Sequence, residues 1–133
     1  MSKKVILCVD DEKIILISLK AQLREKFGTE YIYETSENAT EAMELIDELS
    51  LEDIGIIVIV SDWLMPGIKG DEFLIRVHKK HPNIVKVMLT GQADKNAIEN
   101  AQKHANLHAC ISKPWDADVL VNTIKSGLAK LPK

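Results

Sequence analysis

The chain alternates, five times in 133 residues, between a short apolar run rich in β-branched residues and a segment with helical spacing. The apolar runs cover about residues 4–9, 31–35, 54–61, 84–90 and 109–112. Helical patterns follow at about 13–27, from Asn38 onward, at 70–80, at 94–103 and from Asp116 onward. Such alternation is typical of βαβ units, whose strands pair in parallel through right-handed crossovers. We therefore expect an α/β fold with a doubly wound, five-stranded parallel sheet and five helices.

Composition narrows the class of protein further. A length of 133 residues predicts one domain over residues 1–133, and 46% hydrophobic with 28% charged residues is ordinary for a globular protein. The net charge of −3 gives no electrostatic reason to expect direct contact with nucleic acid. No apolar run reaches membrane-spanning length, and we expect neither a signal peptide nor a disulfide framework. We expect a cytoplasmic protein with no membrane partner.

Polar residues follow four of the apolar runs. Asp10 and Asp11 come after the first run, Asp62 ends the third, Thr90 ends the fourth, and Lys113 follows the fifth. In an open parallel sheet, the carboxyl ends of the strands meet at one edge, where ligands bind. The sequence therefore predicts three carboxylates, a hydroxyl and an ammonium group in one cleft.

This set of groups suits phosphoryl transfer. Three carboxylates so close together repel one another unless a divalent cation joins them, and hard oxygen ligands without His or Cys favour Mg²⁺. Asp62 is the candidate nucleophile, which would form an acyl phosphate. Asp11 and Asp62 would bind the metal directly and Asp10 through a water molecule. Lys113 and Thr90 would stabilise charge on the transferred phosphoryl group.

The order and spacing of these motifs resemble the receiver domain of two-component response regulators over nearly the whole chain. The acidic pair, Asp62 with Gly70 further on, the Thr90-Gly91 pair and Lys113-Pro114 all occur in the family's order. The resemblance implies a flavodoxin-like sheet with strand order 2-1-3-4-5. It also implies that the backbone carbonyl of Leu64 is a metal ligand and that the Lys113–Pro114 peptide bond is cis.

The resemblance further implies a phosphorylation-dependent signalling switch. Asp62 would accept a phosphoryl group from the phosphohistidine of a histidine kinase or from a phosphotransfer protein. The resulting conformational change would reach an output domain or target protein through the fourth helix, fifth strand and fifth helix, roughly residues 94–130. The same face could also form a homodimer. Such a domain catalyses its own phosphorylation and dephosphorylation and is not a conventional metabolic enzyme. It can also be the receiver portion of a larger regulator or hybrid kinase.

Three positions depart from the family pattern. Cys110 replaces the aromatic ring that usually moves when the threonine reorients. We therefore expect the change to be carried by residues 91–94 and the thinly packed fourth helix. Leu64 and Gln92 stand where the family tunes phosphoryl lifetime, and an apolar Leu64 cannot orient a water molecule, so we expect slow loss of phosphate.

Other interpretations stay open. A haloacid-dehalogenase-like phosphatase would need a second aspartate at position 64, and a flavin-binding module would need a Ser/Thr/Gly-rich loop after the first strand. Individually, Asp10 and Asp11 could only cap a helix, and Thr90 or Lys113 could be ordinary strand-end residues. We expect the four histidines to be surface residues and Trp63 and Trp115 to pack at the rim of the cleft. In the strand order that the resemblance implies, Cys8 and Cys110 lie on strands too far apart, so we expect no disulfide between them.

Overall fold

The computed structural model of the chain describes residues 3–92 and 94–131. Its sheet is parallel, with strand order β2-β1-β3-β4-β5, as the resemblance implied. Each strand lies within one residue of its predicted bounds, and the set is β1 (Lys4–Val9), β2 (Ile32–Ser36), β3 (Gly55–Ser61), β4 (Val85–Thr90) and β5 (Ala109–Ser112). The free thiols of Cys8 and Cys110 belong to β1 and β5, which are separated by β3 and β4.

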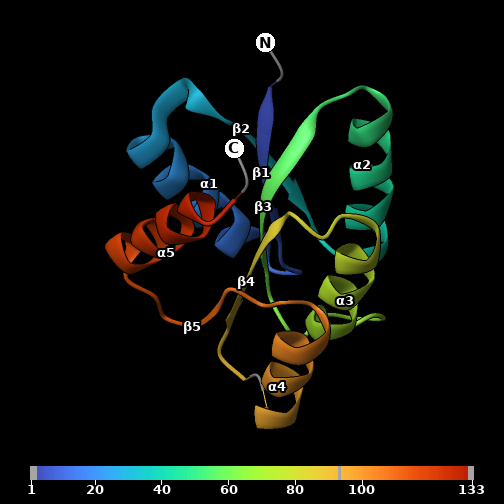
Figure 1. Cartoon of the computed structure of the whole chain (residues 1–133). Helices are drawn as coiled ribbons and strands as arrows, with labels where there is room; N and C mark the ends of the chain where they lie inside the picture. Colours follow the sequence, from blue (N-terminus) through green and yellow to red (C-terminus); the bar gives the residue numbers. More distant parts are fainter. Residues whose placement is uncertain (1–2, 93, 132–133) are drawn as a thin grey trace.

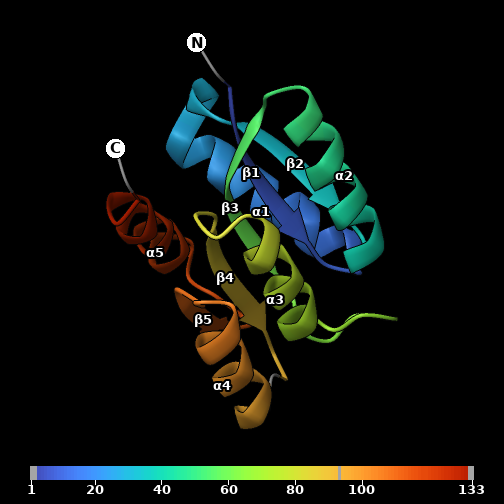
Figure 2. The ribbon, with the colours of Figure 1, turned by 45° about the vertical axis from the view of Figure 1, so that its right-hand side comes forward.

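Helices cover both faces of the sheet (Figures 1 and 2). On one face lie α1 (Lys13–Phe27) and α5 (Ala117–Ala129), and on the other lie α2 (Ala39–Leu51), α3 (Gly70–Lys80) and α4 (Lys95–His104). Side chains along β1 alternate between the two layers, so that Ile6 and Cys8 pack with α1 and α5, and Leu7 and Val9 pack with α2 and α3. This period of two places one core on each side of the sheet.

The helix starts follow the capping residues that the sequence predicts. The side chain of Asn38 accepts a hydrogen bond from Glu41 N at 2.9 Å, and Asp116 caps α5 in the same manner. Asp94 accepts from Ala97 N at 2.8 Å, so it is the cap of α4 and not its first helical residue. The loop predicted to carry the switch includes Ala93, which lies outside the described residues.

The four histidines that we expected at the surface differ in their exposure. Only His104 is exposed, whereas His78, His81 and His108 are half-buried. The Nε2 atom of His108 lies 3.0 Å from the carbonyl oxygen of Thr123 and 2.9 Å from Ser126 Oγ, so the ring ties the start of β5 to α5. Within the described ranges, no helix is long and apolar enough to cross a membrane.

Candidate functional site

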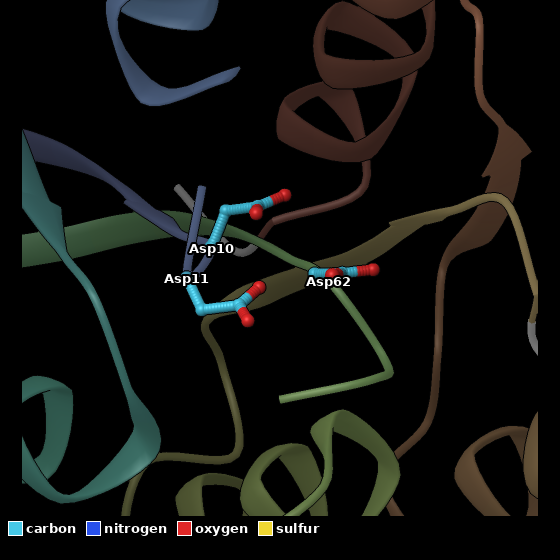
Figure 3. A group of neighbouring side chains, drawn as sticks. All are labelled: Asp10, Asp11 and Asp62. Carbon is cyan, nitrogen blue, oxygen red and sulfur yellow. The ribbon is translucent and has the colours of Figure 1, made fainter. Parts of the chain in front are cut away.

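The carboxyl ends of the strands bring the predicted site residues together. Asp10 and Asp11 follow β1, Asp62 follows β3, and one oxygen from each of these three carboxylates lies within 4.8 Å of the others (Figure 3). Asp10 and Asp62 are buried, whereas Asp11 is exposed. Thr90 ends β4 and is buried, and Lys113 follows β5. The Lys113–Pro114 peptide bond is cis, as the resemblance implied.

Lys113 is the positive group of this cluster. Its Nζ lies 2.7 Å from Asp10 Oδ2 and 3.5 Å from Asp62 Oδ2. Burial by itself lowers the pKa of Lys113, but the hydrogen bond and charge of Asp10 and the charges of Asp62 and Glu12 outweigh it and raise the pKa. Lys113 therefore stays protonated at neutral pH and offsets part of the negative charge.

Asp62 follows β3, whose last four residues are buried. Burial raises the pKa of Asp62 and the charge of Asp10 adds to this, while Lys113, the Thr90 hydroxyl and the Trp63 amide lower it without cancelling it. The Trp63 amide donates to Asp62 Oδ1 at 2.8 Å. These neighbours do not offset the whole cost of burying the ionised Asp62 carboxylate. A further cation beside Asp62 would therefore stabilise its charged form.

The turn between Asp62 and α3 depends on Gly70. A Cβ at this position would lie 2.1 Å from the carbonyl oxygen of Asp62 and 2.8 Å from Trp63 Cα. The Gly70 amide also donates to the carbonyl oxygen of Trp63 at 2.7 Å. The sequence motif contained Gly70, but only the structure gives the physical reason, which is the close approach of the two backbone segments.

The alternative in which the acidic pair supports a helix start holds in part for Asp10. Its Oδ1 accepts a hydrogen bond from Glu12 N at 2.9 Å, just before α1, while its Oδ2 binds Lys113. The side chain thus stabilises the turn and faces the cluster at the same time. Asp11 has its side chain at the solvent edge of the cluster, with Glu12 exposed beside it.

A cleft of about 510 Å³ opens above this cluster. Leu64, 45% exposed, and Gln92 lie in its wall. The indole rings of Trp63 and Trp115 pack against the cores on opposite faces of the sheet. The full lining is Asp11, Glu12, Asp62, Leu64, Met65, Pro66, Thr90, Gly91, Gln92 and Lys113.

The metal ligands predicted from the sequence fit a hard divalent cation in their chemistry. The cluster contains carboxylate oxygens without imidazole or thiolate, which is the ligand set that Mg²⁺ prefers. The exposed position of Asp11 and the cleft beside it leave room for metal-bound water, which Mg²⁺ usually retains.

Two features escaped the sequence analysis. Asp71 in α3 accepts hydrogen bonds from Trp63 Nε1 and from Asn100 Nδ2, both at 3.1 Å, and so connects the turn after Asp62 to α4. Lys86 is buried within β4. A lysine inside the apolar run of residues 84–90 was the available signal for the second feature. The first joins residues 29 positions apart, which no local pattern predicts.

Comparison with known proteins agrees with the fold. The family model described as response regulator receiver domain matches residues 6–125. Hydrogenase transcriptional regulatory protein HoxA of Cupriavidus necator is 32% identical over 123 residues, which cover 92% of this chain and 24% of that protein. The chain therefore spans about a quarter of the length of this relative.

Solved structures give the same result. A CheY-like response regulator receiver domain protein from Methanospirillum hungatei has a TM-score of 0.83 and 32% identity, covering 97% of this chain and 96% of that one. The beryllofluoride-activated NtrC4 receiver domain dimer has a TM-score of 0.81 and 28% identity, covering 95% of this chain and 97% of that one. The chain belongs to the response regulator receiver domain family.

Proposed function

We propose that the chain is a phosphorylation-dependent switch that accepts a phosphoryl group on Asp62. The observation that carries this proposal is the position of Lys113 Nζ, 2.7 Å from Asp10 and 3.5 Å from Asp62, beside a cluster of three carboxylates. A surface that only binds a partner has no need for two buried carboxylates beside a poorly exposed ammonium group. A site that must bind a phosphoryl group and a cation needs both signs of charge close together.

The transfer forms one bond and breaks another. A carboxylate oxygen of Asp62 attacks phosphorus, and the bond from phosphorus to the donor breaks with its electron pair leaving on the donor. With a phosphohistidine donor, the leaving nitrogen is an imidazole nitrogen. Lys113 would move from Asp10 toward the phosphoryl oxygens, and the hydroxyl of Thr90 would donate to another of them.

Mg²⁺ is the cofactor that we propose, with Asp10, Asp11, Asp62 and the backbone carbonyl of Leu64 as its protein partners. When bound, it would supply positive charge that neutralises the carboxylates and the phosphoryl oxygens. The raised pKa of Asp62, caused first by its burial, supports this because it shows that the described residues do not fully compensate the carboxylate.

We propose two kinds of partner. A histidine kinase or phosphotransfer protein would donate the phosphoryl group, and an output domain or target protein would respond to the phosphorylated form. The length of HoxA, about four times that of this chain, supports an output unit linked to a receiver. The NtrC4 receiver dimer supports a homodimer as a further proposal. The face formed by α4, β5 and α5 is the surface that the resemblance to receivers implies for it. Leu64 in the cleft wall supports slow loss of the phosphoryl group, because its side chain cannot hold an attacking water.

Mass spectrometry of the intact protein tests the proposal. After incubation with acetyl phosphate and Mg²⁺, the mass is expected to rise by one phosphoryl group, and removal of Mg²⁺ with a chelator is expected to prevent this. Asp62→Asn should abolish the increase. Asp47→Asn, at an exposed position on α2, is the matched control and should be labelled as wild type. Equal labelling of Asp62→Asn would contradict the assignment.

A further inference from the structure

A chain of hydrogen bonds runs from Asp62 to α4. The Trp63 amide donates to Asp62 Oδ1 at 2.8 Å, and the indole Nε1 of the same residue donates to Asp71 Oδ1 at 3.1 Å. Asp71 lies in the first turn of α3, and its other oxygen accepts from Asn100 Nδ2 at 3.1 Å. Asn100 belongs to α4, so three side chains connect the candidate phosphorylation site to that helix.

The surroundings of Trp63 hold its indole in this position. The ring packs against the same core as Ile98 of α4 and Cys110 of β5. Lys69 Nζ lies over the face of the ring, 5.1 Å from its centroid, in a cation–π contact. The three bridging side chains are half-buried, and a hydrogen bond to a carboxylate is stronger there than one in full contact with water.

The helix at the far end of this chain is weakly held by apolar packing. The buried residues of α4 are the two alanines Ala97 and Ala101, with Ile98 partly buried. Cys110 of β5, which packs against the same core, also has a small side chain. Because few apolar contacts hold α4, its polar contact with α3 has a larger effect on its position. In a helix with a broad apolar face the same contact would matter less.

The contacts in the site are those that unmodified Asp62 and its neighbours make. Lys113 binds Asp10 more closely than Asp62, and the Thr90 hydroxyl accepts from Gln92 N at 3.3 Å. Transfer to Asp62 would convert the ionised carboxylate into an acyl phosphate, so that negative charge lies on the phosphoryl oxygens and the acyl oxygen that the Trp63 amide binds becomes a neutral carbonyl. The hydrogen bond from the Trp63 amide would then weaken. The indole ring of Trp63 would be less firmly positioned as a result.

We infer that the Trp63–Asp71–Asn100 bridge is a latch that holds α4 in its resting position and is released when Asp62 is phosphorylated. This inference rests on the proposed function and assigns Asp71 and Asn100 as positioning residues for the switch. A contact that exists only in the resting form stabilises that form, so breaking it shifts the population toward the activated one. By linkage, the activated form binds a phosphoryl group, and its mimic beryllofluoride, more tightly.

Binding of beryllofluoride in saturating Mg²⁺, followed by the ¹⁹F NMR signal of the bound group, tests the latch. Asn100→Ala removes the amide while keeping a good helix former, and half-saturation is expected at a beryllofluoride concentration about fivefold lower, near the lower end of allosteric coupling. Asn96→Ala, an exposed asparagine on the same helix, is the matched control and should bind as wild type.

A second variant separates a latch from a merely structural contact. Trp63→Phe removes the indole N–H and is expected to tighten binding by a similar factor. Because both changes break the same bridge, the double variant should bind no more tightly than either single variant. Thermal unfolding of each variant verifies that it is folded.

The outcomes distinguish the two proposals. Binding to wild type with unchanged or weaker binding to Asn100→Ala and Trp63→Phe would overturn the latch and leave the proposed function standing. Absence of beryllofluoride binding to folded wild type would overturn the proposed function, and the latch with it. Tighter binding to Asn100→Ala but equally to Asn96→Ala would assign the effect to helix propensity and contradict the latch.

Discussion

Lys113 and Lys86 are two poorly exposed lysines near opposite ends of the sheet, and they differ in the charges around them. Lys113 follows β5, its side chain is 17% exposed, and two carboxylates lie within 3.5 Å. Lys86 is the second residue of β4 and is 1% exposed, and its Nζ donates to the carbonyl oxygen of Ile84 at 2.6 Å.

The pKa shifts of the two lysines have opposite directions. Burial lowers the pKa of Lys86 from 10.5 to about 8, because a neutral carbonyl does not compensate the buried charge. Burial acts in the same sense on Lys113, but Asp10, Asp62 and Glu12 more than offset it, so that its pKa is raised. A buried ammonium group is therefore stabilised by its neighbours at the site and destabilised at the other end of the sheet.

The effect of Lys86 extends to α3. Its charge, together with burial as the larger cause, lowers the pKa of His78. The Nδ1 atom of His78 is buried without a hydrogen-bond partner among residues 3–92 and 94–131. This end of the molecule thus contains polar groups that reduce stability, and no part of the proposed chemistry uses them.

The largest expected difference between the two lysines is in phosphorylation. Lys113→Met should slow labelling by acetyl phosphate by about 100-fold, because removal of one group that stabilises transition-state charge typically has this effect. Lys86→Met should be labelled at the wild-type rate. Stopped time courses of intact mass give both rates, and a rate for Lys113→Met within threefold of wild type would show that the ammonium is not part of the reaction.

Mg²⁺ should stabilise the folded protein through the carboxylate cluster and not through the surroundings of Lys86. At a Mg²⁺ concentration 100-fold above its dissociation constant, the free energy of unfolding is expected to rise by about 2.7 kcal/mol. Lys86→Met should show the same increase as wild type, whereas Asp11→Asn should lose most of it. Urea titrations with and without Mg²⁺ measure the effect, and Asp47→Asn is again the control. A full Mg²⁺ effect in Asp11→Asn would remove Asp11 from the ligand set.

Replacing Lys86 should make the protein more stable. Lys86→Met has a similar volume and removes a poorly compensated buried charge, so the free energy of unfolding at pH 7 should rise by about 1–2 kcal/mol. Lys103→Met, on the exposed face of α4, is the control and should have little effect. Urea unfolding measures both, and a clear loss of stability in Lys86→Met would show that the ammonium has a partner that compensates it.

The pH dependence of that gain follows from the pKa values. Between about pH 8 and 10.5 the unfolded chain retains the Lys86 proton while the folded chain has lost it, so wild-type stability should rise with pH in this window. The advantage of Lys86→Met over wild type should shrink over the same window. The raised pKa of Lys113 has the opposite sign, because its contribution is present below the unfolded pKa and is lost only as pH rises above that window. An advantage that stays constant to pH 10.5 would contradict the assignment to Lys86.

The sequence predicted the parts of the molecule that local patterns determine. Periodicity located the five α-helices and five strands of the described residues but not the short 3-10 helix at Gly28–Glu30. Asn38 and Asp116 marked helix starts because their side chains can bond to the backbone amides that follow. The ends of the apolar runs also predicted that Asp10, Asp62, Thr90 and Lys113 would meet, since parallel strands end at one edge. The resemblance to receivers supplied the strand order, which periodicity alone does not determine.

What the sequence did not predict depends on contacts between distant segments. The bridge from Trp63 through Asp71 to Asn100 requires the relative rotation of α3 and α4, and nothing local specifies it. The half-buried His108 reaches α5 only because Gly127 leaves space beside Val85 and the imidazole ring. Helix-end histidines and an isolated aspartate resemble surface residues in sequence, and only tertiary packing decides otherwise.

The central claim of this account is that Asp62 is the residue that receives the phosphoryl group. Borohydride reduction of the protein labelled by acetyl phosphate and Mg²⁺, followed by peptide mapping, tests it most directly because reduction of an acyl phosphate converts the aspartate to homoserine. The account predicts homoserine at position 62 and unmodified aspartate at positions 10, 11 and 71. Homoserine at another of these positions, with Asp62 intact, would contradict it.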